Sequence, residues 1–258
     1  MEHLSVFFNQ TPLGFVSLDG HEDLYRLEYS TSWLKGQGFS VSPHLKHGNC
    51  PSGAVKRFLA NLLPEGKWLE ELSCSTQVSK NNIFALIAVL GCETTGALTF
   101  RITGESHDPV PTTFRVVTPE ELQSRISSRK QISIASWDGK PRLSVAGVQD
   151  KLPLLIKSNG EMGIGEGDLA STHILKFGRD PDIHMVVNEY ICMELAHRIK
   201  LPVAEVMLKR FGEPVSLIKR FDRRLTKDGV ERLHVIDGCQ ILDLPPTYKY
   251  ERPFGKSG

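Results

Sequence analysis

A change of composition near residue 105 divides the chain into two parts, and this division limits the fold more than any other feature. Residues 103–111 read Thr-Gly-Glu-Ser-His-Asp-Pro-Val-Pro, a run of Gly, Pro and polar residues that is typical of a connecting segment. A chain of 258 residues can form two ordinary domains, since domains commonly contain ~100–150 residues. We therefore expect one domain over residues 1–105 and a second over residues 106–258.

The overall composition is that of a soluble globular protein, with 40% hydrophobic residues, 24% charged residues and a formal net charge of +1. This near-neutral balance gives no electrostatic case for nucleic-acid binding by the chain as a whole. Apolar runs such as residues 83–90 are far shorter than the ~20 residues that cross a bilayer. The start Met1-Glu2-His3 lacks the basic residues of a signal peptide, so we expect no membrane partner.

Cysteine usage indicates a reducing compartment. The five cysteines are scattered, odd in number and without a Cys-x-x-Cys pair, so free thiols and a cytoplasmic location are expected. His44, His47 and Cys50 have a spacing that metal ligands can use. A structural zinc site takes four ligands, however, and no fourth is nearby, so a loop without metal is the favoured interpretation.

The first part alternates strand-like and helix-like segments. Strand-favouring residues cover 4–8, 13–18 and 25–29, and turn residues separate these runs. Apolar residues recur at helical spacing in 54–63, and a second helix is predicted for 82–90. This part holds no grouping of nucleophile, base and orienting residue that predicts catalysis.

The second part is predicted to be a β-rich layer with one prominent helix. Thr118 can cap a helix that has Pro119 at its first position and Glu121 completing a capping box. Strands are expected at 152–157, 173–177, 203–208 and 215–218, with a packed helix at 186–199. The glycine-rich residues 160–167 are interpreted as a hairpin turn between the first two strands, because no helix follows to complete a phosphate-binding motif. The fold class predicted is α+β: a small N-terminal α/β subdomain, then a β-rich lobe of the kind that binds nucleotides in kinases.

Two lysines in this second part could contact phosphates. Residues 144–151 (Ser-Val-Ala-Gly-Val-Gln-Asp-Lys) contain small residues that let backbone N–H groups approach a phosphate, and Lys151 adds a positive charge. Taken alone, this stretch also suits a plain hairpin turn. Lys176 ends the apolar run 173–177 and could hold the phosphates of ATP, although a solvated strand end is the simpler interpretation.

Two further segments fit the same arrangement. Glu189 lies on the predicted helix thirteen residues after Lys176 and could pair with it, although a solvated helix face would look the same. Residues 217–224 begin in a predicted strand and continue into charged residues. A hinge has this pattern, and its backbone can hydrogen-bond the edge of adenine.

The order and spacing of these pieces resemble HipA kinases. The resemblance rests on residues 144–151, on Thr-His-Ile-x-Lys at 172–176, on Asn-Glu-Tyr at 188–190, on Arg-Phe-Asp-Arg-Arg at 220–224, and on residues 237–251. In the first part, Asn-Leu-Leu-Pro-Glu-Gly at 61–66 is similar to the N-terminal subdomain of the same family, as are residues 29–34 and 90–97. The similarity covers nearly the whole chain.

This resemblance implies a set of site residues. Those over the ATP phosphates would be Ala146, Gly147, Val148, Gln149, Asp150 and Lys151, with Lys176 contacting the phosphates and Glu189 positioning Lys176. Lys219, Arg220 and Phe221 would border the adenine, and Ser144 matches the serine that family members autophosphorylate. Val148 and Asp150 depart mildly from the family pattern, which has Ala and Glu there.

One family feature is missing from the sequence. HipA kinases carry an Asp-x-His-x-x-Asn catalytic loop and a later metal-binding Asp, and neither motif occurs in these 258 residues. We therefore expect no catalytic residue and no metal ligand in this chain, which would be a truncated, inactive portion of an ATP- and Mg²⁺-dependent serine/threonine kinase toxin. The alternative is a non-catalytic interaction module.

The resemblance also implies partners. They are a helix-turn-helix antitoxin similar to HipB and a protein substrate, of which an aminoacyl-tRNA synthetase is one class. DNA would be contacted only indirectly, through the antitoxin.

Overall fold

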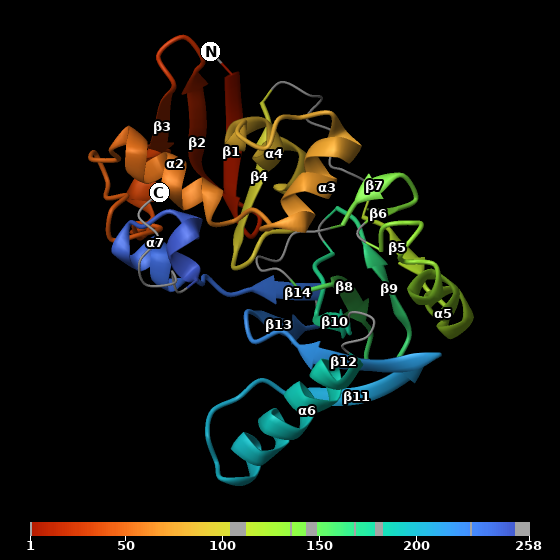
Figure 1. Cartoon of the computed structure of the whole chain (residues 1–258). Helices are drawn as coiled ribbons and strands as arrows, with labels where there is room; N and C mark the ends of the chain where they lie inside the picture. Colours follow the sequence, from red (N-terminus) through yellow and green to blue (C-terminus); the bar gives the residue numbers. More distant parts are fainter. Residues whose placement is uncertain are drawn as a thin grey trace, which may run out of the picture. The chain divides into compact units, whose positions relative to one another are not determined.

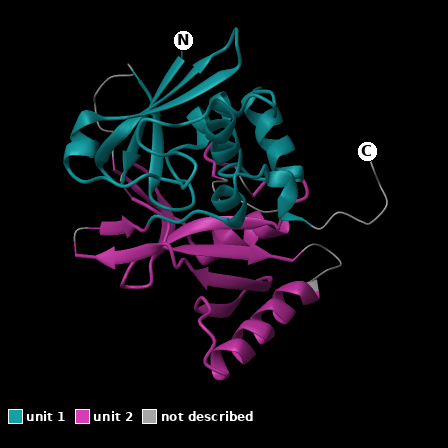
Figure 2. Cartoon of the chain, turned by 90° about the vertical axis from the view of Figure 1, so that its left-hand side faces the viewer, with its two compact units in different colours: residues 1–105, 234–258 teal, residues 106–233 magenta. Residues whose placement is uncertain are grey.

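The computed structural model describes residues 2–103, 112–134, 136–142, 149–167, 169–178, 183–227 and 229–250. The chain separates into two compact units, shown in Figures 1 and 2. Unit 1 contains Met1–Glu105 together with His234–Gly258, and unit 2 contains Ser106–Leu233. The boundary expected after residue 105 falls between the units, but residues 234–258 group with unit 1 rather than with the second part. Whether the units are also independent folding domains remains a prediction.

A four-stranded antiparallel sheet forms one layer of unit 1, in the order β3-β2-β1-β4. Its strands are β1 (Glu2–Phe8), β2 (Thr11–Asp19), β3 (Leu24–Tyr29) and β4 (Leu98–Ile102). The three strands expected from the sequence are therefore confirmed.

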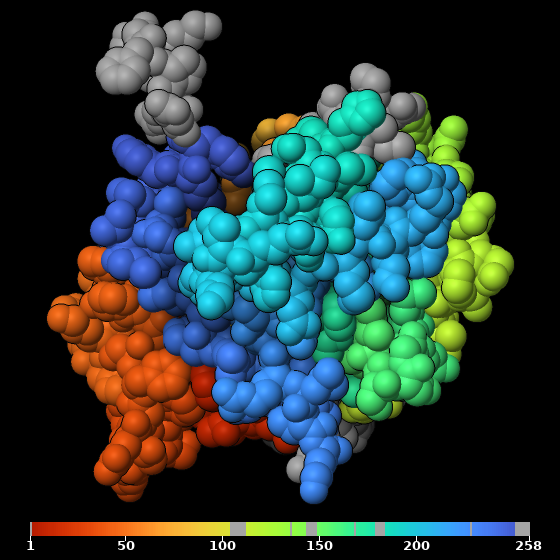
Figure 3. Space-filling model, turned by 90° about the horizontal axis from the view of Figure 1, so that it is seen from below, coloured from red at the N-terminus to blue at the C-terminus, as the bar shows by residue number. Residues whose placement is uncertain are grey.

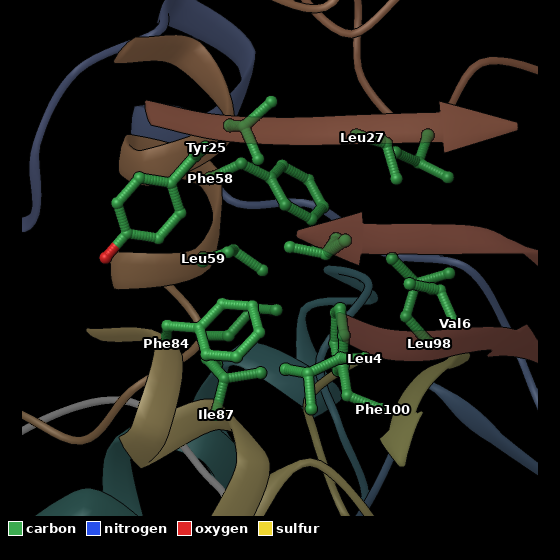
Figure 4. Packing of buried hydrophobic residues seen from close by; sticks show 14 of the residues in the cluster. Leu4, Val6, Tyr25, Leu27, Phe58, Leu59, Phe84, Ile87, Leu98 and Phe100 are labelled. Carbon is green, nitrogen blue, oxygen red and sulfur yellow. The ribbon is translucent and has the colours of Figure 1, made fainter. Parts of the chain in front are cut away.

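Helices cover one face of this sheet. They are α1 (Thr31–Lys35), α2 (Ser52–Ala60), α3 (Lys67–Thr76) and α4 (Ile83–Leu90). The two predicted helices are α2 and α4, and the side chain of Asn82 caps α4 by accepting a hydrogen bond from the Ala85 N–H. Figure 4 shows the resulting core, in which Phe58 and Ile87 from the helices meet Leu4 and Phe100 from the sheet.

The segment 234–250 completes unit 1 by packing beside α2. It contains α7 (Gly238–Leu242) and the short 3₁₀ helix η1 (Pro246–Lys249). Gln240 Nε2 donates to the Phe58 carbonyl at 3.1 Å, and Asn61 Nδ2 donates to the Leu244 carbonyl at 2.9 Å. The first bond satisfies a carbonyl in the last turn of α2, and the second satisfies a carbonyl just after α7, so both tie the segment to α2.

Unit 2 is built on a six-stranded sheet in the order β11-β12-β10-β8-β9-β5. Its strands are β5 (Phe114–Val116), β8 (Lys151–Ile156), β9 (Met162–Gly165), β10 (His173–Phe177), β11 (Val206–Phe211) and β12 (Glu213–Lys219). Two small hairpins, β6 (Ser136–Trp137) with β7 (Lys140–Pro141) and β13 (Arg223–Thr226) with β14 (Gly229–Arg232), accompany it. The α+β prediction is confirmed.

Helix α5 (Pro119–Ser127) begins where the sequence predicts. The Glu121 N–H donates to Thr118 Oγ1 at 3.2 Å, which confirms the cap. The side chain of Glu121 does not complete a capping box, because it binds the Arg115 guanidinium at 2.6 and 2.7 Å instead. A charge-assisted bidentate pair is stronger than a single bond to a backbone N–H, and it is the arrangement found here.

The glycine-rich stretch is a strand, so the expected turn over residues 160–167 is wrong. Gly163 and Gly165 lie in β9, which pairs with both β8 and β5, and the turn occupies the residues around Gly160 (φ +85°). A Cβ added at Gly163 would lie 2.4 Å from the Arg115 carbonyl oxygen, and one at Gly165 would lie 2.7 Å from the Leu169 side chain. These glycines therefore allow close approach of neighbouring chain segments.

Helix α6 (Ile183–Arg198) crosses one face of the sheet of unit 2. The sequence predicted a packed helix, yet Ile191 and Leu195 are exposed and Val186 is the one buried side chain among those described. In the described part of the chain no helix is long and apolar enough to span a membrane.

Candidate nucleotide-binding site

The two predicted phosphate-contacting lysines lie side by side on adjacent strands. Lys151 is the first residue of β8 and is paired directly with Lys176 of β10. Directly opposite residues of an antiparallel pair point to the same face, with Cβ atoms ~4.5–5.5 Å apart. Both side chains therefore leave the sheet on one face, where Lys151 is buried and Lys176 is partly buried.

Helix α6 covers the same face and carries a carboxylate to Lys176. Ser216 of β12 pairs with Lys176 from the other side, and its hydroxyl donates to the Val186 carbonyl at 3.2 Å. Glu189 lies three residues further along α6, and its Oε1 is 2.5 Å from Lys176 Nζ. The sequence could not place Ser216 in this arrangement, because a lone serine in an apolar strand carries no pattern.

The segment leading into β8 is tied to the end of β10. The Phe177 N–H donates to the Asp150 carbonyl at 3.0 Å, one residue beyond Lys176. Gln149 and Asp150 are thus described residues close to the two lysines. The predicted residues Ser144, Ala146, Gly147 and Val148 lie outside the described residues.

The hinge residues follow β12 and differ in what their side chains can reach. Lys219 pairs with His173, an odd number of residues from Lys176, so its side chain points to the opposite face of the sheet. Lys219 Nζ binds Glu205 at 2.9 and 3.1 Å. A ligand bound on the sheet face that carries Lys176 could therefore be reached by the backbone of Lys219 but not by its side chain.

Arg220 is a buried structural cation. Its guanidinium donates to both carboxylate oxygens of Asp222, at 2.9 and 2.7 Å, and to Ser171 Oγ at 2.9 Å. Arg223 joins the group by donating to Asp222 at 2.8 Å. By contrast, the Phe221 side chain is 71% exposed and offers an apolar surface that a base could contact.

The first residue of β10 connects the hinge to the sheet. The Arg220 N–H donates to the Thr172 carbonyl at 2.9 Å, and Thr172 Oγ1 lies 2.8 Å from His173 Nδ1. Burial, with a smaller effect of the Lys219 charge, lowers the pKa of His173 below its ordinary value. This burial favours the neutral form of His173, whose ring lies within hydrogen-bonding distance of Thr172.

An ion cluster that the sequence analysis did not find lies where residue 142 leads into the segment 143–148. Glu166 accepts hydrogen bonds from Arg142 at 2.5 Å and from Lys140 at 2.9 Å. These bonds lower the pKa of Glu166 to about 2. No local spacing connects Glu166 to residues more than twenty positions earlier, so the sequence holds no signal for this contact.

The three possible metal ligands of the first part have other partners. His44 Nε2 lies 2.9 Å from the Ile241 carbonyl, the His47 ring packs on Tyr29, and Cys50 Sγ donates to the Lys46 carbonyl. Within the described ranges no group of three or more His, Cys, Asp or Glu residues could hold a metal ion.

Comparisons with known proteins identify the family of the chain. The family model described as HipA N-terminal domain matches residues 4–101, and the one described as HipA-like C-terminal domain matches residues 143–257. The chain belongs to the HipA family. The serine/threonine-protein kinase toxin HipA of Shewanella oneidensis is 40% identical over 98% of this chain, and a relative from Sinorhizobium fredii is 31% identical over 96%.

A solved structure supports the same family. The Shewanella oneidensis HipA in a complex with HipB and operator DNA has a TM-score of 0.83 and 39% identity over 98% of this chain. The HipA match covers 59% of that solved chain, and this chain spans 58% and 60% of the two relatives in sequence. About two fifths of each relative therefore has no counterpart in these 258 residues.

Proposed function

We propose that this chain is the N-terminal and nucleotide-binding portion of a HipA-type serine/threonine kinase toxin, and that it binds ATP on the face of unit 2 that carries Lys151 and Lys176. The single observation that carries the proposal is the 2.5 Å ion pair between Lys176 and Glu189. A strand lysine held by a helix glutamate is the arrangement that fixes the ATP phosphates in protein kinases.

Each group has a role that its position supports. The ammonium of Lys176 binds a phosphate while Glu189 limits its movement, and Lys151 supplies a second positive charge on the neighbouring strand. The backbone of residues 219–221 hydrogen-bonds the edge of the adenine, and the exposed Phe221 ring lies beside the base. Mg²⁺ would neutralise charge on the phosphates, but we assign it no ligand in this chain.

Nucleotide binding is tested by isothermal titration calorimetry with ATP. We expect Lys176→Met to weaken ATP binding by roughly tenfold or more, because a charge-assisted bond to phosphate contributes about 1.5–3 kcal/mol. The matched control is Lys209→Met, which removes an exposed lysine from strand β11 of the same sheet. Equal affinity in the wild-type chain and the Lys176→Met variant would show that the wrong lysine has been assigned.

Phosphoryl transfer is a separate question. Because the sequence holds no Asp-x-His-x-x-Asn motif to orient an acceptor hydroxyl, we propose that these 258 residues bind nucleotide without transferring phosphate. Incubation with γ-labelled ATP should give no label on Ser144 or on an added protein. Label that depends on ATP and on Lys176 would contradict this.

The second candidate function is an interaction module. It is favoured by the solved relative, whose structure is a complex of HipA, HipB and DNA. In this proposal the chain binds a HipB-like antitoxin, contacts DNA only through it, and resides in the cytoplasm. In the longer relatives a protein substrate would join, with an aminoacyl-tRNA synthetase as the implied class. Titration of the chain with purified Shewanella HipB, with and without ATP, separates this function from nucleotide binding.

A further inference from the structure

Strand β3 forms one edge of the sheet of unit 1, next to β2 (Figure 1). The N–H of Ser30, just after the strand, donates to β2 at 2.8 Å. Because successive residues of a strand direct their backbone groups to alternate sides, the N–H and C=O groups of Leu27 and Tyr29 point away from β2. The Tyr25 N–H has the same outward direction, and it donates to Ser52 Oγ at the start of α2, at 2.9 Å.

Beyond Tyr25 the outer side of β3 is open. In the part of the chain that the structure describes, the outward backbone groups of Leu27 and Tyr29 take part in no hydrogen bond. The strand contains no proline, and its six residues pair with β2 without a bulge. Prolines and bulges are common ways to block an edge, and a regular edge without them is a template for pairing with a further strand.

An open cavity of about 460 Å³ lies along this edge. Residues 26–29 of β3 form one wall, and Leu34 of α1 together with residues 48–50 forms the rest. The orange part of the chain, to which residues 48–50 belong, lies at the surface on the left of Figure 3. The volume is within the ~300–1,000 Å³ of ordinary ligand sites, so a short extended segment can enter beside the open backbone groups.

The side chains of Arg26 and Glu28 give the edge a charge pattern. Both are exposed, and they lie on the same face of the sheet because they are two residues apart. Their partners on β2 are Ser17 and Phe15, and among the described residues neither charge forms an ion pair. In a strand added outside β3, the residues opposite Arg26 and Glu28 would be at positions without hydrogen bonds, where opposite side chains approach most closely.

We propose that β3 binds an extended peptide of a partner protein, which adds to the sheet of unit 1 as a fifth, antiparallel strand. Main-chain hydrogen bonds to Leu27 and Tyr29 supply affinity, and the side chains select the sequence. Complementary charge requires an acidic residue opposite Arg26 and a basic residue opposite Glu28. The residue between these two lies opposite Leu27, whose side chain is in the core, so it is apolar. Read from its N-terminus, the peptide is therefore basic, apolar, acidic.

The first test compares two peptides of the same composition by fluorescence anisotropy. The fluorescein-labelled peptide Thr-Val-Lys-Val-Glu-Thr has the proposed order of charges, and Thr-Val-Glu-Val-Lys-Thr has the reverse order. We expect the wild-type chain to bind the first peptide about fivefold or more tightly than the second, because the second places like charges opposite each other. The variant Arg26→Glu/Glu28→Lys should prefer the second peptide. Equal binding of the two peptides by the wild-type chain, or the same preference in the variant, would overturn the proposal.

Backbone methylation of the peptide separates strand pairing from charge attraction. In the proposed register the N–H of the valine between lysine and glutamate points to Leu27, whereas the N–H of the glutamate points away from β3. We expect N-methylation of this valine to weaken binding about tenfold or more, since it removes a hydrogen bond and adds a clash at the edge. N-methylation of the glutamate is the matched control and should leave the affinity unchanged. Equal effects of the two methyl groups would contradict strand addition.

Hydrogen exchange followed by NMR locates the bound peptide. Binding should slow exchange at the Leu27 and Tyr29 N–H groups and leave Arg26 and Glu28 unchanged, because their N–H groups already face β2. Protection confined to unit 2, or no binding of either peptide at millimolar concentration, would overturn the proposal. So would a dimer of the chain that Arg26→Glu/Glu28→Lys dissociates, because a second copy would then occupy the edge. Both substituted side chains are exposed, so an unchanged thermal unfolding midpoint is expected and shows that the variant is folded.

Discussion

At the scale of single residues, the site depends on which face of a strand each side chain takes. The sequence singled out Lys176 because it ends an apolar run, and Lys151 because it ends the stretch of small residues 144–151. The sequence did not show that they lie side by side, since this depends on the register of β8 and β10, whose paired residues are 19 to 25 positions apart. The same alternation moves the Lys219 side chain to the other face, which no single-strand pattern could reveal.

The contact between Glu189 and Lys176 leads to a direct test of the positioning role of Glu189. We expect Glu189→Gln to weaken ATP binding severalfold, since the amide no longer holds the Lys176 ammonium by charge. The free energy of unfolding should change by less than about 1 kcal/mol, as is usual for partly exposed ion pairs. Calorimetry with ATP and chemical denaturation measure the two effects.

Glu194→Gln is the matched control, because Glu194 lies on the same helix and forms no ion pair among the described residues. If both variants bound ATP as well as the wild-type chain, Glu189 would have no positioning role.

At the scale of elements, the sequence predicts what a local pattern encodes and misses what distant contacts decide. The apolar run 173–177 and the cap at Thr118 were sufficient to predict β10 and α5. Strand β9 was missed because glycines usually end strands, and here Gly163 is required by the close approach of β5. The hinge was predicted as a strand that runs into charged residues and whose backbone bonds the adenine edge. No local pattern indicated that Arg220, Asp222 and Arg223 would be buried against one another.

The turn after β12 should be sensitive to the loss of its carboxylate. We expect Asp222→Asn to lower the free energy of unfolding by about 3–5 kcal/mol, because it removes the anion that two buried guanidinium groups share. Urea denaturation followed by fluorescence measures this. Glu231→Gln on β14, which breaks an exposed pair with Arg224 of β13, should cost less than about 1 kcal/mol. Similar losses in the two variants would contradict the assignment.

The ion cluster of Glu166, Arg142 and Lys140, where β7 and β9 end, should make the free energy of unfolding depend on pH. The pKa of Glu166 is lowered from 4.5 to about 2 in the folded chain by Arg142 and then Lys140, so its contribution is complete above about pH 4.5 and is lost as the pH falls toward 2. We expect Glu166→Gln to destabilise the chain by about 1–2 kcal/mol at pH 7, after allowance for solvent screening, and by progressively less below pH 4.5.

Thermal unfolding between pH 7 and pH 3 tests the dependence. Glu161→Gln is the control, because Glu161 forms only an exposed pair with Lys157. A difference between wild type and Glu166→Gln that stayed constant across this range would rule out the ionised carboxylate as its source.

At the scale of the whole molecule, two motifs that the sequence holds far apart meet in one unit. Residues 61–66 and residues 237–251 were each recognised as similar to HipA kinases, but nothing local indicates that they touch. In the structure Lys249 Nζ lies 3.1 Å from Glu65 and 2.8 Å from Asp237. Contacts across more than 180 positions leave no periodicity in the sequence, so no local pattern indicates that residues 234–258 group with residues 1–105.

Lys249 should hold this closing segment in place. We expect Lys249→Met to leave the carboxylates of Glu65 and Asp237 without their shared cation and to lower the free energy of unfolding of unit 1 by about 2–3 kcal/mol. Hydrogen exchange should accelerate in residues 238–249 and at the end of α2. Lys67→Met, which removes an exposed lysine from α3, should leave that exchange unchanged. Unaltered exchange in both variants would mean that Lys249 has no such role.

Unit 1 is built from residues 1–105 and 234–258, which has a consequence during synthesis on the ribosome. At about 5–20 residues per second, the 128 residues of unit 2 (106–233) take roughly 6–26 s to be translated before α7 exists. Throughout that interval the Phe58 carbonyl has no Gln240 and the Arg57 side chain has no Asp243 to bind. The nascent chain therefore presents an incomplete α2 surface to chaperones and proteases until about residue 250 has emerged from the exit tunnel.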